Sequence, residues 1–112
     1  MTHEMKLQPK YFEFILNGTK RIELRLNDEK RQIIKVGDSI SFLKEPDLKE
    51  EFTAKVVGLL NYSSFTELFK DFDISVLADK SMTKEELINV LQEFYTIEKQ
   101  STYGVLGIKI EI

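Results

Sequence analysis

Hydrophobic and polar residues are arranged along the chain in a way that predicts five strands and three helices. Alternation is typical of a strand, and a spacing of three to four residues is typical of a helix. The strands are expected at residues 1–6, 21–26, 39–44, 52–60 and 105–112. Strands outnumber helices in this order, and several connections have hairpin length. We therefore expect an α+β fold, with a mixed, mostly antiparallel sheet curled into a small β-barrel and helices flanking it.

The helix ends are marked by residues that suit them. The first helix is expected to begin at Pro9, where a missing N–H costs nothing, and to end at Gly18, which suits a left-handed backbone. The other two begin at capping boxes, Ser-x-x-Glu at 64–67 and Thr-x-x-Glu at 83–86. On the last helix we expect an inward face formed by Leu87, Val90, Leu91, Phe94 and Tyr95.

Length and composition narrow the class of protein. The 112 residues suit one domain over residues 1–112, and 42% hydrophobic residues suffice for a core. The chain has no cysteine, which excludes disulfides and fits a cytoplasmic protein. No apolar run approaches the roughly 20 residues of a membrane span, and residues 1–6 lack the apolar region of a signal peptide. We therefore expect no membrane association.

Charge is divided unevenly along the chain. The net charge of −3 argues against a protein that coats nucleic acid without sequence preference. However, residues 1–44 hold nine Lys/Arg and six Asp/Glu, whereas residues 45–112 hold seven and thirteen. The first part therefore suits an anionic ligand, provided that the two parts do not intermix in space.

The most informative segment is residues 18–26, which read G-x-K-x-x-E-x-R through Gly18, Lys20, Glu23 and Arg25. Glu23 and Arg25 lie two apart on a predicted strand, so their side chains leave the same face. Strict alternation would place Lys20 with the apolar residues; we expect it instead in irregular backbone after Gly18, within reach of Glu23. Mixed charge beside a sharp turn suits a polar ligand site, and the alternative is a solvated charged face.

Three further residues are candidates for ligand contact. Tyr62 and Ser63 follow the long strand and could stack on a base and hydrogen-bond to it, and Tyr103 could approach a ligand beside Gly104. For the tyrosines, burial of the ring is the alternative.

His3 is the only histidine, and without cysteine it cannot form a typical zinc site. We expect no metal site and no cofactor.

These features resemble the ASCH family, which is related to the PUA-like barrels. The resemblance is carried by the helix that ends at Gly18, the motif Gly18, Lys20, Glu23 and Arg25, the Val-Gly-Asp turn at 36–38 and the closing strand from Tyr103. It covers nearly the whole chain. It implies a β-barrel with helices beside a cleft, motif residues lining that cleft, and binding of RNA or a nucleotide.

The resemblance also implies an enzymatic alternative. One group of similar proteins deacylates N4-acetylcytidine with a lysine at the Lys20 position, a threonine nucleophile and a glutamate, and others have been proposed to cleave RNA. Here Glu23 stands at the threonine position, and Lys80 falls near the third catalytic position. If the chain is a hydrolase acting on a modified nucleoside or on RNA, Lys20 and Glu23 are the catalytic candidates, with Glu23 as general base.

The sequence is therefore compatible with three functions: a binding module, a hydrolase and a protein–protein module. In a binding module, Lys20 and Arg25 contact a phosphate or base carbonyl, Glu23 orients them or accepts from a base amino group, and a tyrosine stacks. In a hydrolase, Lys20 and Glu23 act on the substrate directly. A protein–protein module is the third alternative. The sequence specifies neither the ligand nor an oligomeric state.

Overall fold

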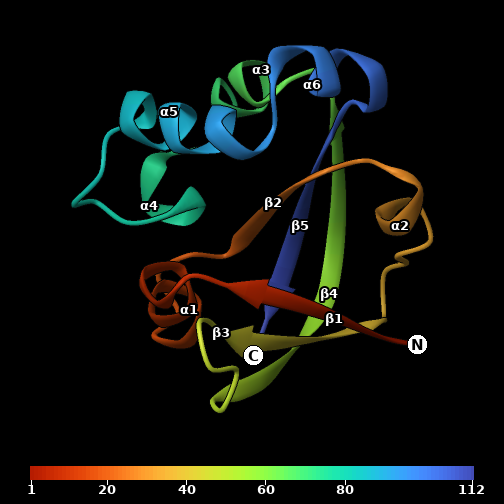
Figure 1. The fold of residues 1–112 in the computed structure, drawn as a ribbon, viewed down its shortest axis with the longest axis vertical. Coiled ribbons are helices and arrows are strands. Elements are labelled where there is room, and N and C mark those ends of the chain that lie inside the picture. The colour runs from red at the N-terminus through yellow and green to blue at the C-terminus, as the bar shows by residue number, and fades with distance from the viewer.

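Five strands form one curled sheet in the computed structural model, which describes residues 1–112 (Figure 1). The strands are β1 (Thr2–Leu7), β2 (Ile22–Leu26), β3 (Ser39–Lys44), β4 (Glu51–Tyr62) and β5 (Val105–Glu111). Their order across the sheet is β1-β3-β4-β5-β2, with β1 and β3 parallel and the other pairs antiparallel. The predicted mixed, mostly antiparallel sheet is therefore confirmed. It forms a half-barrel whose two edge strands are β1 and β2.

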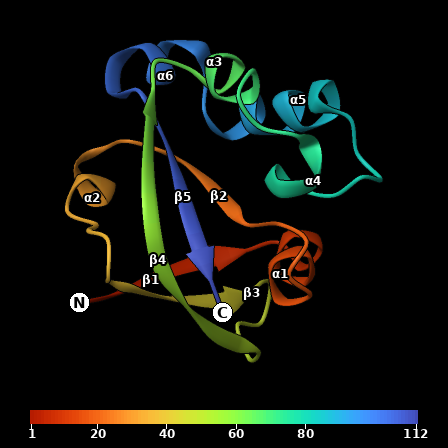
Figure 2. The same ribbon diagram turned by 180° about the vertical axis from the view of Figure 1, so that it is seen from behind.

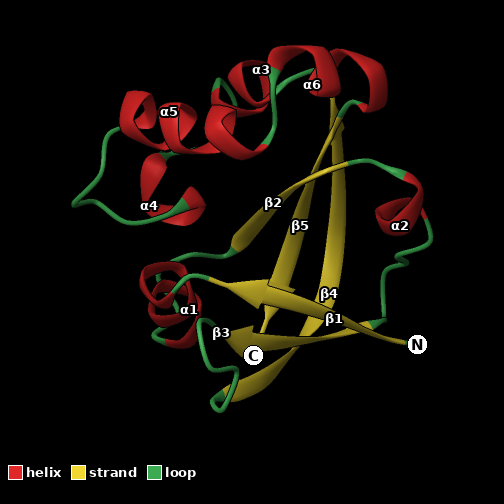
Figure 3. Ribbon diagram, viewed as in Figure 1, coloured by secondary structure: helices red, strands yellow, loops and turns green.

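Six helices flank the sheet, twice as many as the hydrophobic pattern predicts (Figure 3). They are α1 (Pro9–Leu16), α2 (Glu29–Gln32), α3 (Phe65–Phe69), α4 (Ile74–Leu77), α5 (Lys84–Phe94) and α6 (Ile97–Tyr103). The three predicted helices correspond to α1, α3 and α5. The other three were missed because they have four to seven residues, too few turns for a hydrophobic stripe to stand out. None of the helices is long and apolar enough to cross a membrane.

Several predicted helix ends are confirmed in detail. Gly18 follows α1 with a φ of 84°, the left-handed conformation that favours glycine. Thr83 and Glu86 form the complete capping box at the start of α5. At α3 the box is half formed, because Ser64 accepts from the backbone of Glu67 while the Glu67 side chain pairs with Lys70 instead.

The half-barrel encloses the first of two hydrophobic clusters, here called the sheet cluster. Phe12 and Ile15 from α1 pack there against inward residues of the strands, such as Ile40 and Phe42 of β3, and these side chains are almost completely buried. The cluster consists of Met5, Leu7, Phe12, Ile15, Ile34, Ile40, Phe42, Ala54, Val56, Leu106, Ile108 and Ile110. A β-bulge between Val56 and Gly58 shifts the register of the long β4 strand against β5, and such irregularities help a sheet to bend.

Helices α3–α6 gather at one end of the molecule and form a cap over β2 and the neighbouring end of β5 (Figure 2). The alternation in β2 explains this packing, since Ile22, Leu24 and Leu26 all face the helices. The resulting cap cluster consists of Ile22, Leu24, Leu26, Phe65, Leu68, Phe69, Leu77, Ala78, Met82, Leu87, Leu91 and Val105. β2 is therefore covered by the cap on one face, and its other face carries the charged residues of the motif.

Two residues of the predicted inward face of α5 lie outside both hydrophobic clusters: Val90 is half-buried and Phe94 is exposed. Phe94 was expected on the inward face of α5, but 54% of it is exposed, whereas Leu87 and Leu91 are buried as expected. Phe94 is the last residue of α5 and Tyr95 continues in an extended conformation. The helix end therefore projects beyond the cap cluster, and Phe94 borders a pocket instead.

Candidate functional site

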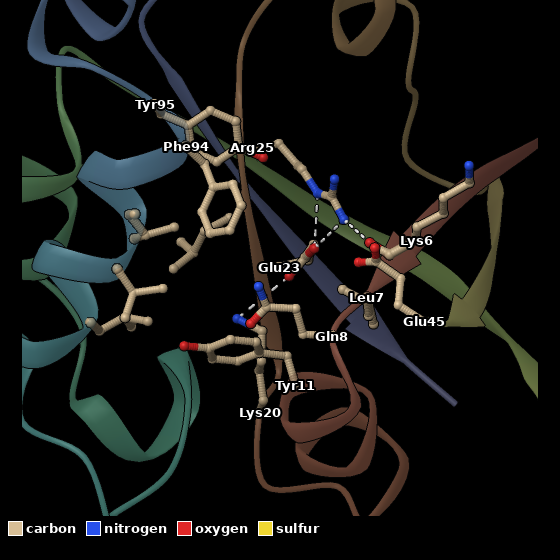
Figure 4. Close-up of a pocket in the computed structure, with 14 residues that line it drawn as sticks. Lys6, Leu7, Gln8, Tyr11, Lys20, Glu23, Arg25, Glu45, Phe94 and Tyr95 are labelled. Carbon is tan, nitrogen blue, oxygen red and sulfur yellow. Dashed lines mark hydrogen bonds and ion pairs between the residues drawn. The ribbon is translucent and has the colours of Figure 1, made fainter. Parts of the chain in front are cut away.

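The charged residues of the motif meet at the junction between the cap and the half-barrel (Figure 4). Lys20 lies in the irregular backbone between Gly18 and β2, and Glu23 and Arg25 lie on the same face of β2, as predicted. We refer to these three residues as the charged triad. Lys20 and Glu23 are 3% and 5% exposed, so the solvated charged face is not what the structure contains.

Lys20 is held by three contacts. Its Nζ donates hydrogen bonds of 2.6 Å to the carbonyl oxygens of Ile22 and Leu77, and it lies 3.6 Å from Glu23 Oε1. Because Leu77 belongs to α4, this ammonium joins β2 to the cap. The three N–H donors of a lysine are thereby directed at protein oxygens.

Arg25 binds the other side of the Glu23 carboxylate. Its Nε and Nη2 lie 2.9 Å and 2.8 Å from Glu23 Oε2, and Nη2 also donates to the backbone oxygen of Lys6 at 3.0 Å. Since Lys6 belongs to β1, the guanidinium spans the two edge strands of the half-barrel. These contacts use Nε and Nη2, and Nη1 takes no part in them.

Burial and charge shift the pKa values of the triad. Burial lowers the pKa of Lys20 below its usual 10.5, although the Glu23 carboxylate acts in the opposite direction. Burial alone would raise the pKa of Glu23, but the charges of Arg25 and Lys20 outweigh it and hold that pKa below its usual 4.5. Glu23 is therefore an ionised carboxylate at neutral pH and accepts hydrogen bonds without donating any.

The triad forms part of the wall of a pocket with a cavity volume of about 170 Å³, here called the triad pocket. Its residues come from the end of β1 and the following turn, from α1, from β2 and the segment before it, from the turn after β3, and from α5 and the residue that follows it. They are Lys6, Leu7, Gln8, Tyr11, Lys20, Glu23, Leu24, Arg25, Glu45, Leu87, Val90, Leu91, Phe94 and Tyr95. Three cations and two carboxylates line it, which leaves one net positive charge. The pocket thus combines a charged wall with apolar and aromatic surfaces, as small-molecule sites commonly do.

The remaining predicted site residues do not line the triad pocket. Gly18 borders a larger groove on the far side of Lys20, together with the C-terminal end of β5. Tyr62 is half-buried and its hydroxyl donates to Asp71 at 2.5 Å, while Ser63 and Tyr103 are exposed at the ends of β4 and α6. Ligand contact by these four residues stays a prediction, and it would need surfaces outside the triad pocket.

The aromatic residues that do line the pocket are Tyr11, Phe94 and Tyr95. Tyr11 belongs to α1, and burial, followed by the nearby Glu23 carboxylate, raises the pKa of its hydroxyl. The hydrophobic pattern placed Phe94 and Tyr95 on the inward face of α5. For Phe94 and Tyr95 the signal in the sequence was an aromatic residue at the end of an amphipathic helix, because such a residue projects past the core that the preceding turns cover.

No group of three or more His, Cys, Asp or Glu residues is arranged to hold a metal ion. His3 instead lies 2.8 Å, through Nε2, from Oδ2 of Asp38. That contact, followed by a backbone hydrogen bond from Lys35, lowers the pKa of Asp38 to about 2. The arrangement ties β1 to the turn before β3, away from the triad pocket.

Comparison with known proteins identifies the family. The family model described as the ASCH domain matches residues 5–112, and no curated protein matches the chain. Among solved structures, the hypothetical protein PH0355 is similar, with 41% sequence identity and a TM-score of 0.87 over 99% of this chain and 98% of that one. Protein PF0455 from Pyrococcus furiosus has 39% identity and a TM-score of 0.78, over 99% and 96% of the two chains.

A more distant structure has the same fold. It is the S128A mutant of the ASCH protein ZmASCH from Zymomonas mobilis, with 11% identity and a TM-score of 0.71. The match covers 99% of this chain and 68% of the other. At that identity the similarity establishes the shared fold alone.

Proposed function

The chain belongs to the ASCH domain family, and from this premise we propose that it binds RNA or a nucleotide with one base in the triad pocket. The observation that carries the proposal is the combination of a buried, ion-paired triad with aromatic walls. A planar base presents apolar faces and a polar edge, and the pocket offers surfaces of both kinds. Its volume of about 170 Å³ suits one ring system better than several nucleotides.

The chemistry of the triad restricts which edge of a base it would accept. Glu23 is an acceptor, because the pKa of its carboxyl is lowered, and Arg25 is a donor that contacts Glu23 and Lys6 and also lies beside the Tyr95 hydroxyl. A base with an amino group beside a ring nitrogen or carbonyl oxygen would complement this pair. Each good bidentate contact of this kind contributes about 1–3 kcal/mol of discrimination between bases.

Lys20 would act through position and charge. Its ammonium is occupied by the carbonyls of Ile22 and Leu77 and by the Glu23 carboxylate, so it is a positioning residue for Glu23. Lys6 is the exposed cation among the residues that line the pocket. With one net positive charge in the pocket, we expect the affinity for RNA to depend only weakly on salt.

The test is binding of nucleoside monophosphates and of five-nucleotide single-stranded RNAs, measured for the wild type and two variants. Arg25→Lys keeps the charge but loses the planar fork, and Tyr95→Leu removes an aromatic wall. We expect each to weaken binding about tenfold, in line with the usual contributions of a bidentate pair and of a stacked base. The matched control is Arg21→Lys, because Arg21 is exposed and lies outside the triad pocket. Unchanged affinity in both variants, with the fold intact, would refute the proposed site.

A small hydrolase acting on a modified nucleoside or on RNA is the second candidate. The lowered pKa of Lys20 and its position beside Glu23 favour it, because perturbed ionisable pairs in pockets are common at catalytic sites. Against it, the lowered pKa of Glu23 makes this carboxylate a weak general base. The decisive assay is product analysis after incubation with acylated cytidines and with RNA. Turnover no greater than that of a Glu23→Gln variant would eliminate the hydrolase.

A further inference from the structure

The sheet face that carries Glu23 and Arg25 continues beyond the triad pocket. Residues two apart on a strand share a face, so Asn27 follows Arg25 on the same side of the chain. The hydrogen bond of 3.0 Å from Asn27 N to Gly104 O carries the β2–β5 pairing one residue past the end of the strand. Asn27 therefore lies about 7 Å along β2 from Arg25, the rise of two strand residues.

Strand register places a second amide on this face. Arg25 pairs with Leu106 of β5, and Leu106 pairs with Asn61 of β4. Paired residues of neighbouring strands point to the same side of a sheet, and two strand spacings amount to about 10 Å. Asn61 therefore lies in the same row as Arg25, on the same face as the triad.

Asn27 and Asn61 line one pocket of about 200 Å³, here called the amide pocket. Its other lining residues include Leu59 and Leu106 from the sheet and Arg31 and Gln32 from α2. Figure 1 shows β2 running from the side of α1 and α5 toward α2. Residues of α1 and α5 line the triad pocket, whereas residues of α2 line the amide pocket. The two pockets thus occupy successive positions along one face of one strand, and their volumes are similar.

We propose that the amide pocket holds the nucleoside adjacent to the one in the triad pocket, so that the ligand is an RNA strand of at least two nucleotides. This inference rests on the proposed function and deepens it. It distinguishes a strand of RNA from a free nucleotide, which the triad pocket alone cannot do.

The chemistry of the amide pocket suits the sugar and base of a nucleotide better than its phosphate. The side chains of Asn27 and Asn61 make no hydrogen bond within the protein, and each offers donors and an acceptor. The cation in the pocket, Arg31, is paired with Asp28 at 2.9 Å. Neutral amides of this kind bind ribose hydroxyls and base edges, and the 2′-hydroxyl distinguishes RNA from DNA.

The experiment compares a short ligand with a longer one. The double variant Asn27→Ala/Asn61→Ala keeps the backbone contacts of Asn27 with Gly104 and Gln32, so we expect it to fold. The probes are the four nucleoside monophosphates and five-nucleotide single-stranded RNAs. We expect the affinity for RNA to fall about tenfold, the effect of losing two or so neutral hydrogen bonds, and the affinity for monophosphates to change less than about twofold. The matched control is Asn89→Ala, an exposed amide of α5 outside both pockets.

The outcomes separate this inference from the function on which it rests. If RNA binds and binding depends on Arg25, but the double variant binds RNA as the wild type does, the amide pocket is not a subsite. Equal losses for RNA and monophosphates would also overturn the inference. If neither kind of ligand binds the wild type, the proposed function fails and the subsite fails with it.

Discussion

The sheet cluster and the cap cluster each bury twelve hydrophobic residues, but they are held in different ways. Strands joined by backbone hydrogen bonds, with one bulge in β4, surround the sheet cluster together with α1. The cap cluster is covered by four helices of four to eleven residues and meets the sheet through β2 and the end of β5. Equal burial therefore does not mean equal rigidity, because short helices gain most of their stability from packing rather than from their own hydrogen bonds.

Buried polar contacts compensate for this difference. Lys20 donates to the Leu77 carbonyl in α4, and the buried side chain of Gln100 joins two cap segments by accepting from Phe65 N and donating to Tyr95 O. These contacts have defined directions, whereas hydrophobic contacts do not. The position of the cap, and with it one wall of the triad pocket, therefore depends on a few polar groups at the junction.

Replacing Glu23 with glutamine should have the largest effect on this junction. We expect the free energy of unfolding to fall by about 3–5 kcal/mol, because two buried cations lose their shared anion. Urea unfolding measures the change. The control Glu93→Gln, an exposed carboxylate of α5, should stay within about 0.5 kcal/mol of the wild type. A loss below about 1 kcal/mol for Glu23→Gln would contradict a structural role for the buried ion pairs.

Truncating one leucine in each cluster compares the two directly. Leu68→Ala in the cap and Leu106→Ala in the sheet remove equivalent side chains, 0% and 2% exposed, and each should cost about 2–5 kcal/mol. The rates of backbone amide hydrogen exchange should then distinguish the two variants. We expect Leu68→Ala to speed exchange chiefly in α3 and α5, and Leu106→Ala to speed it in the sheet and the cap together. Identical exchange maps would show that the clusters are one cooperative unit.

Acid should weaken the junction through Glu23. The pKa of this carboxyl is lower in the folded protein than its usual 4.5, so its contribution to stability is complete above that value and is lost as the pH falls through the folded-state pKa. As the pH falls below 4.5 and through the folded-state pKa, wild type should therefore lose more stability than Glu23→Gln.

Comparing wild type with Glu23→Gln also cancels the contribution of a second acidic group to the pH dependence of stability. Asp38, with a pKa of about 2 through its contact with His3, is present in both proteins and cancels in the difference. Parallel stability curves for the two proteins would show that Glu23 does not titrate with a lowered pKa. Thermal unfolding at a series of pH values provides the measurement.

The smallest expected effect on stability concerns the N-terminal cap of α5, one of the cap helices. Thr83→Ala removes the side chain that accepts from Glu86 N at the start of α5, and should cost about 1 kcal/mol. The control Thr66→Ala, at an exposed position inside α3, should be neutral or slightly stabilising because alanine favours a helix. If α5 were held by packing alone, the two variants would have the same stability in urea.

Local patterns predicted those parts of the structure that local rules control. Alternation in β2 placed Glu23 and Arg25 on one face and Ile22 and Leu24 on the other, since side-chain direction on a strand has a period of two. The left-handed turn at Gly18 and the capping box at Thr83 depend only on adjacent residues. Helices α2, α4 and α6 escaped prediction because short segments carry little periodic signal.

The site needed information of longer range. Lys20 was expected near Glu23, but its bond to the Leu77 carbonyl joins residues 57 positions apart. The wall that carries Phe94 and Tyr95 comes from a helix that reaches the motif only through the fold of the cap. Tyr62 and Tyr103, although suitable for stacking, do not line the triad pocket: Tyr62 packs against the cap cluster and Tyr103 is exposed.

The sequence by itself determined the strands, the main helices, the family and the chemical identity of the charged motif. These follow from side-chain periodicity and from the short-range preferences of glycine, proline and capping residues. Only the tertiary structure decided that the motif is buried rather than solvated, that Arg25 spans the two edge strands, and that aromatic residues of a distant helix complete the pocket. Burial and ion pairing of a residue depend on which distant segments of the chain pack against it. The residues next to it in the sequence do not specify those segments.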